Sequence, residues 1–177
     1  MKKILLTVVF FLLSINCKSQ GISSELMRIQ ELPYAQGLSG DSLYWSIVKK
    51  GIAVVPALIN EISDTTTTGA VVPNFGGYNT IGDIAYRIIK EIIHEIPTRD
   101  FITSKEDDIG GYWYYWNFVG ASPKNRVLFE EKLRVWFNTN QNDFLWYTDD
   151  KEYRVYRTWY ANSKKHPAEG YYILNKK

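Results

Sequence analysis

Two residues of the chain have the types and the spacing of a metal or acid–base site. Glu91 and His94 stand three positions apart, which places a carboxylate and an imidazole on one helix face, as in carboxylate-bridged two-metal bundles. Such a site needs a second motif of this kind, and the sequence contains none. At about 100° per residue, both side chains fall opposite the isoleucines of this segment. We therefore expect a solvated face on which Asp83 pairs with Arg87, and no metal site.

The remaining candidates for catalysis have no recognisable partner in the sequence. His166 is the only other histidine, and neither a G-x-S-x-G nor an H-E-x-x-H motif accompanies it. Cys17 is the only cysteine, so the body of the protein has no thiolate nucleophile. The acidic clusters at 106–108 and 149–152 lack the alternating ligand spacing of a calcium loop. We expect no catalytic residue, metal or cofactor, and a small hydrolase is only the third interpretation.

The most unusual segment is Gly110–Phe118, GGYWYYWNF, which holds six aromatic residues in seven positions. Rings at this density fall on both faces of a strand or nearly all round a helix, so not every ring needs to be buried. Exposed Trp and Tyr rings offer a large contact area for a protein partner or for stacking on sugars. The alternative, which carries more weight, is that the rings fill the core. The candidate binding residues are Tyr112, Trp113, Tyr115 and Trp116.

Residues 1–19 have the composition of a secretory signal peptide, with two lysines, an apolar run from Ile4 to Leu13 and then small and polar residues. As a helix the run spans about 15 Å, half of a bilayer core, so we expect no transmembrane segment. Cleavage after Ser19 predicts a secreted or periplasmic protein. The alternative is cleavage before Cys17 with a lipid anchor on that thiol, although the residue before it is not the small one usual in such motifs.

Length and charge limit the remaining classes. The formal net charge of the 177 residues is +2, and three of the lysines lie in the first nineteen residues. A near-neutral body without a stripe of Lys and Arg argues against a nucleic-acid partner. The rest of the chain is long enough for one compact domain. Within it we distinguish a helical part, 20–100, from an aromatic-rich part, 101–177.

Apolar residues at helical spacing predict three short helices near the start of this domain. The first covers 22–32. The second covers 41–50, with Asp41 as its N-cap and Gly51 just past its end. The third covers 54–62, where a proline is tolerated in the first turn.

The clearest helix is expected from Thr80 to Ile96. Thr80 begins a variant of the capping box with Asp83, seven apolar residues mark one face, and Pro97 stops the helix. The preceding segment, 65–79, contains a threonine run and the sequence VVPNFGGYN, which has too much Pro and Gly for a central strand. We expect a loop or an edge segment there.

The segment from Asp41 to Ile96 resembles a bacterial HEAT-like helical repeat. DSLYWSIVKKGIAVVPALINEISD looks like one antiparallel helix pair with a Gly-Ile-x-x-x-Pro-x-Leu-Ile turn, and TIGDIAYRII is similar to the start of a further helix. The resemblance covers about 56 of the 177 residues, without the family's regular period of about 40 residues. It implies a curved helical scaffold for protein contact that carries no catalytic residues.

The C-terminal part is predicted to combine one helix with short strands. Ser122-Pro123 is a typical helix start, and the stripe from Phe129 to Phe137 gives that helix a buried face. Beyond it, aromatic-rich segments at 144–147, 153–160 and 171–174 are expected to be extended. The fold class expected is thus mainly α, with HEAT-like antiparallel helix pairs followed by an aromatic-rich helix and short strands.

From these observations we expect a secreted or periplasmic protein that binds without catalysis and acts as a helical scaffold for protein contact. The alternative is binding of cell-wall or extracellular glycan through the aromatic platform at 112–116.

Overall fold

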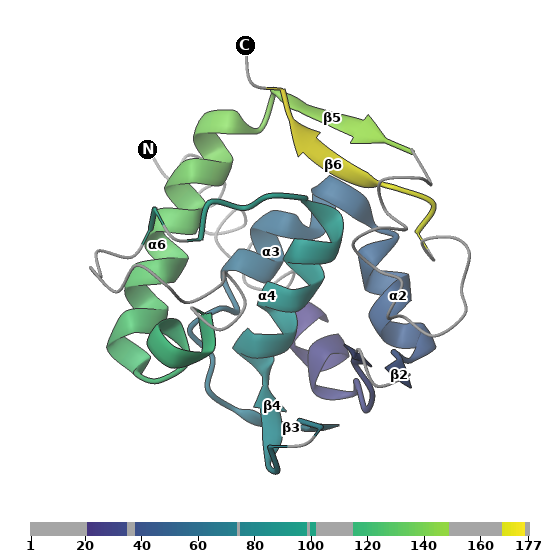
Figure 1. Ribbon diagram of the computed structural model, residues 1–177, viewed down its shortest axis with the longest axis vertical. Coiled ribbons are helices and arrows are strands. Elements are labelled where there is room, and N and C mark those ends of the chain that lie inside the picture. The colour runs from purple at the N-terminus through teal and green to yellow at the C-terminus, as the bar shows by residue number, and fades with distance from the viewer. Residues whose placement is uncertain are drawn as a thin grey trace, which may run out of the picture.

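The computed structural model describes residues 21–34, 38–73, 75–98, 100–101, 115–148 and 168–175 (Figure 1). Residues 21–27 are helical. The other elements are β1 (Pro33–Tyr34), β2 (Leu38–Ser39), α2 (Ser42–Val48), the 3-10 turn η1 (Gly51–Val54), α3 (Val55–Ile59), β3 (Thr67–Val71), β4 (Tyr78–Thr80), α4 (Ile81–Ile92), the π-helical turn η2 (Tyr115–Val119), α6 (Pro123–Asn140), β5 (Phe144–Tyr147) and β6 (Tyr171–Leu174).

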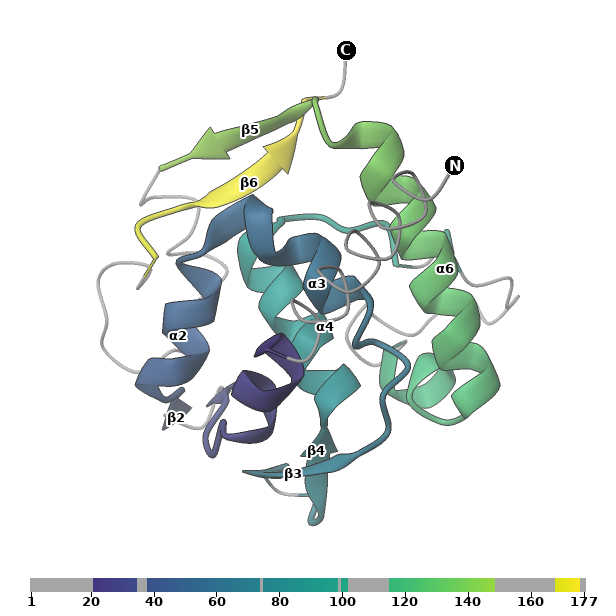
Figure 2. The same cartoon turned by 180° about the vertical axis from the view of Figure 1, so that it is seen from behind.

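Helices dominate the described fold, as the sequence predicted, and the strands form small antiparallel pairs. The pairs are β1 with β2, β3 with β4, and β5 with β6. Helix α4 lies in the middle of the molecule, and α2, α3 and α6 pack around it (Figures 1 and 2). The β5–β6 pair and the β3–β4 hairpin lie at opposite ends of the molecule (Figures 1 and 2).

Helix α4 begins with the capping box that the sequence predicts. The side chain of Thr80 accepts a hydrogen bond from the backbone N–H of Asp83, and the Asp83 carboxylate accepts one from the Thr80 N–H at 2.9 Å. These two bonds satisfy N–H groups that a helix start otherwise leaves without partners. The isoleucines of α4 are buried and form the centre of the core.

The end of α4 differs from the prediction. The helix stops at Ile92 instead of Ile96, because Ile93 has an extended backbone and forms a parallel bridge with Tyr172 of β6. The N–H of His94 donates to the carbonyl of Tyr172 at 2.8 Å. Strand pairing with a distant segment therefore ends this helix one turn before the proline.

The predicted helix pair at 41–62 is not antiparallel. The segment Gly51–Ile59 consists of η1 followed directly by α3. It meets helix α2 at 99°, so the chain turns through nearly a right angle. Gly51 makes this turn possible, since its φ of 63° lies in the left-handed region. The buried stripe of α3 is as expected, and α3 packs on α4. No single helix of the described ranges is long and apolar enough to cross a membrane; only the bent pair 42–59 passes that length and composition test.

Asp41 caps α2, as predicted, and also ties this helix to the chain before β1. One carboxylate oxygen accepts the N–H of Tyr44 at 2.8 Å, and the other accepts the N–H of Gln30 at 2.8 Å. A single side chain thus satisfies donors from two segments.

Replacing Asp41 with alanine is therefore expected to lower the free energy of unfolding by about 2 kcal/mol, the upper end of the range for lost N-caps. The Asp41→Asn variant keeps one acceptor oxygen, so its loss should be smaller. Denaturant unfolding measures the loss of free energy in both variants, and we expect their m-values to equal that of the native chain. Equal stability of the alanine variant and the native chain would contradict the double role of Asp41.

The C-terminal half follows the sequence closely where it is described. Helix α6 begins after Ser122 with proline at its first position, and Phe129, Leu133 and Phe137 are buried. Strands β5 and β6 form at the predicted positions, 144–147 and 171–174, in one continuous antiparallel register. The third predicted extended segment, 153–160, lies outside the described residues.

Candidate functional site

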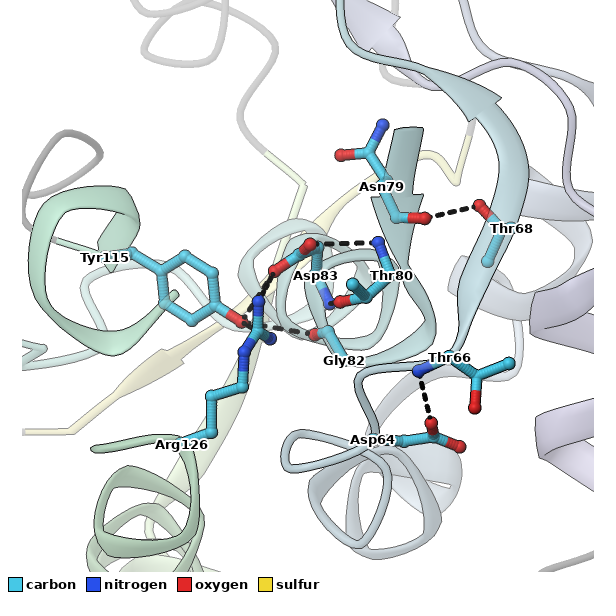
Figure 3. Close-up of polar contacts among 9 residues, drawn as sticks. All are labelled: Asp64, Thr66, Thr68, Asn79, Thr80, Gly82, Asp83, Tyr115 and Arg126. Carbon is cyan, nitrogen blue, oxygen red and sulfur yellow. Dashed lines mark hydrogen bonds and ion pairs between the residues drawn. The ribbon is translucent and has the colours of Figure 1, made fainter. Parts of the chain in front are cut away.

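The most unusual polar group of the described chain is a buried ion pair between α4 and α6. Nη2 of Arg126 donates to Oδ1 of Asp83 at 2.7 Å, and the two side chains are only 4% and 3% exposed. Figure 3 shows the guanidinium pointing from α6 to the start of α4. The expected solvated pairing of Asp83 with Arg87 is therefore wrong. Arg87 instead lies over the ring of Tyr34, 4.0 Å from its centroid.

Tyr115 completes this cluster from the π-helical turn η2. Its hydroxyl accepts a hydrogen bond from Nη1 of Arg126 at 3.3 Å and lies 3.4 Å from the carbonyl oxygen of Gly82 and from Oδ1 of Asp83. The Tyr115 ring stacks on Tyr86 with centroids 4.0 Å apart. Three segments that are far apart in the sequence are thereby joined around one carboxylate (Figure 3).

Gly82 provides the space for the cluster. A Cβ at this position would lie inside van der Waals distance of the Ile62 carbonyl oxygen and 3.0 Å from Nη1 of Arg126. A glycine in the first turn of α4 therefore allows the turn after α3 and the Arg126 guanidinium to approach the helix closely.

Burial and neighbouring groups raise the pKa values of Tyr115, Tyr86 and Arg126. Burial raises the pKa of Tyr115 well above its usual value, and the Asp83 carboxylate raises it further. Burial also raises the pKa of Tyr86. Burial by itself lowers the pKa of Arg126, but Tyr115 and Asp83 outweigh this effect and raise the pKa. Both phenols are therefore neutral at pH 7 and the guanidinium is charged. Since the side chains are buried and hydrogen-bonded to one another, the arrangement serves to hold α4, η2 and α6 together.

The Glu91 and His94 pair does not form the exposed face that we expected. Glu91 is buried, whereas His94 is partly exposed with its ring 5.1 Å from that of Tyr171. The helix ends between the two residues, so His94 no longer continues the helical face of Glu91. Within the described ranges, no group of three or more His, Cys, Asp or Glu side chains could hold a metal ion.

The four aromatic residues named as a binding platform have different positions. Tyr115 is 1% exposed and belongs to the core, as the core-filling interpretation predicts, so its ring cannot stack on a ligand in this conformation. Trp116 is partly buried and packs against the same core. Tyr112 and Trp113 lie outside the described residues, as do His166 and the acidic clusters at 106–108 and 149–152.

The structure reveals an exposed apolar surface that the sequence reasoning missed, at the end of the β3–β4 hairpin. We call it the hairpin tip and define it as Val71, Phe75 and Tyr78, which are 53%, 71% and 56% exposed. Val71 and Tyr78 are paired across the strands. The signal that could have found it is the absence of any charged residue from 65 to 80, around two consecutive glycines.

The base of the hairpin is well anchored to the helical body. The hydroxyl of Thr68 donates to the carbonyl of Asn79 at 2.8 Å (Figure 3). The Asn79 amide donates to the carbonyl of Ala70 at 3.0 Å. Below them, the N–H of Ile81, the first residue of α4, donates to the carbonyl of Thr66 at 2.9 Å. The tip therefore projects from a base that is hydrogen-bonded to the start of α4.

Comparison with known proteins adds nothing to this geometry. No protein-family model matches the chain, and neither the curated proteins nor the solved structures give a significant match.

Proposed function

We propose that the protein is a non-catalytic binding protein that contacts a protein partner through the hairpin tip. The observation that carries the proposal is the 71% exposure of Phe75 at the end of an anchored, projecting hairpin. Covering a largely exposed aromatic side chain with a partner gains free energy, and buried aromatic anchors carry much of the binding energy in protein interfaces.

The shape and charge of the hairpin tip support a protein surface as the partner. A Cβ at Gly76 or Gly77 would meet no atom within 4 Å, so the space beside these two glycines is open. With no charged residue between 65 and 80, the hairpin tip has no charged side chain that could pair with an ionic ligand. The matching surface is a concave, uncharged and apolar site on another protein.

The proposal also covers the role of the helical body and the location of the protein. The helical body acts as a HEAT-like scaffold that presents the hairpin, and the packing of α3 on α4 supports this part, although the right-angle turn at Gly51 departs from an antiparallel pair. The proposed location is secreted or periplasmic, after removal of residues 1–19, with lipid attachment at Cys17 as the alternative.

Photo-cross-linking from the hairpin tip tests the proposal. A photoreactive phenylalanine analogue replaces Phe75 in the chain produced by its own organism, and the matched control carries the analogue at Val135, an exposed apolar residue of α6. We expect a discrete cross-linked protein from position 75 only. The Tyr78→Ser change should reduce its yield about tenfold or more while leaving the unfolding midpoint unchanged.

Equal products from positions 75 and 135, or none from either, would contradict a partner site at the hairpin tip. Retention on isolated cell-wall glycan that depends on Tyr112 and Trp113, without dependence on Tyr78, would favour the glycan alternative instead.

A further inference from the structure

Strand β5 forms the outer edge of the C-terminal sheet. Its neighbour β6 is paired on both sides, with β5 on one and with Ile93 on the other. In Figures 1 and 2, β5 is the outermost strand at this end of the molecule. Sheet pairing by the described residues therefore stops at β5.

The register shows which backbone groups of β5 face outward. The N–H of Asn175 donates to the carbonyl of Asp143 at 3.0 Å, so these two residues form a hydrogen-bonded pair next to the ladder. Hydrogen-bonded and non-hydrogen-bonded pairs alternate in an antiparallel ladder. Phe144 with Leu174 and Trp146 with Tyr172 are then non-hydrogen-bonded pairs. The backbone N–H and C=O groups of Phe144 and Trp146 thus point away from β6.

Within the described residues, β5 has none of the charge, proline or bulge that usually protects an edge strand. The sequence Phe-Leu-Trp-Tyr contains no charged residue and no proline, and its pairing with β6 has no bulge. Leu145 and Trp146 are 50% and 47% exposed. Edge strands without charge, proline or distortion are templates for pairing with a further strand.

We propose that β5 pairs with β5 of a second copy of this chain, antiparallel, about a two-fold axis that passes beside Leu145. The outward groups lie one residue before and one residue after Leu145. In this register Phe144 of each copy therefore forms a hydrogen-bonded pair with Trp146 of the other, and the edge is self-complementary.

The register and the uncharged side chains of this edge fit pairing with a second copy. Because no residue of β5 is charged, two copies meet without like charges opposite each other. The two Leu145 side chains face each other at the axis, and Trp146 of one copy lies beside Phe144 of the other. A contact of so few residues falls below the roughly 1,000 Å² of a stable interface, so the dimer is reversible and depends on concentration.

A disulfide trap tests the register. Leu145 lies opposite itself in a non-hydrogen-bonded pair, where Cα atoms are about 4.5 Å apart, a separation that a disulfide can span. In a Cys17→Ser background, we expect the Leu145→Cys variant to form a covalent dimer under mild oxidation at least tenfold faster than the matched Val135→Cys variant, whose residue is also exposed. Equal rates at the two positions overturn the proposal.

Sedimentation of two variants at Trp146 tests the backbone pairing. Both variants lose the indole, but only Trp146→Pro also loses the outward backbone N–H of residue 146. The hydrogen bonds between β5 and β6 do not use this N–H, so its loss should weaken only the contact between the two copies. We expect the Trp146→Pro variant to dimerise at least tenfold more weakly than the Trp146→Ala variant. Equal dimerisation of the two, or a native chain that stays monomeric up to millimolar concentration, overturns the proposal. If the proline variant does not fold, the disulfide trap decides alone.

Discussion

Replacing Arg126 with methionine is expected to lower the free energy of unfolding by about 3–5 kcal/mol, a large part of the stability of a domain of this size. The variant keeps the aliphatic stem of the side chain but leaves the Asp83 carboxylate buried without its cation. The variant removes the 2.7 Å hydrogen bond from Nη2 of Arg126 to Oδ1 of Asp83. The remaining contact of this oxygen with the Tyr115 hydroxyl is longer, at 3.4 Å. Denaturant unfolding at pH 7 measures the loss.

A double-mutant cycle separates this ion pair from lost packing. The Asp83→Asn variant removes the charge but keeps an oxygen for the capping bond to Thr80, and the double variant with Arg126→Met should lose less than the sum of the single losses. The Arg134→Met variant is the control, because Arg134 pairs with Glu130 near the surface. It should lose less than about 1 kcal/mol. Additive losses at Asp83 and Arg126 would contradict their coupling.

Replacing Gly82 with alanine is expected to destabilise the protein by about 3 kcal/mol, the upper end of the usual cost of overpacking. In an ordinary helix this change stabilises by up to about 1 kcal/mol, so the prediction reverses the usual sign. The reason is the close approach of the Ile62 carbonyl, a backbone group that cannot move aside like the end of a flexible side chain.

The control for this change is the Gly21→Ala variant. Gly21 is also helical, but a Cβ there meets no atom within 4 Å. We expect Gly21→Ala to leave the thermal midpoint unchanged or to raise it slightly. Gly82→Ala should lower the midpoint by about 6–12 °C, on the basis of about 2–4 °C per kcal/mol for a chain of this length. Similar midpoints for the two variants would show that the turn after α3 yields easily.

Features that depend on neighbouring residues were predictable from the sequence. The capping box at Thr80 and the N-cap at Asp41 use contacts within three residues, and the start at Ser122-Pro123 depends on proline at the first helical position. All three are present as helix starts. The main difference is at Ser122, which precedes α6 without a side-chain capping bond.

Features that depend on distant partners were not predictable in this way. Helical periodicity predicts a solvated face for Asp83, with Arg87 at i+4 as its partner, whereas Arg126, 43 positions away, is the residue that pairs with it. One local signal pointed to the actual arrangement, since Arg126 precedes Phe129 by three residues and shares the buried face of α6. A polar residue on an apolar stripe indicates a buried partner, but periodicity cannot say which residue that partner is.

The bridge between Ile93 and Tyr172 affects the order in which the protein can fold. During synthesis at about 5–20 residues per second, residue 172 follows residue 93 by several seconds. The helices up to α4 can pack during this interval, but the β5–β6 sheet cannot form until β6 has been made. Strand β5, made earlier than β6, then gains its inner partner only after β6 has been made. Two nascent chains therefore cannot associate through a finished β5 edge until each has closed its own sheet.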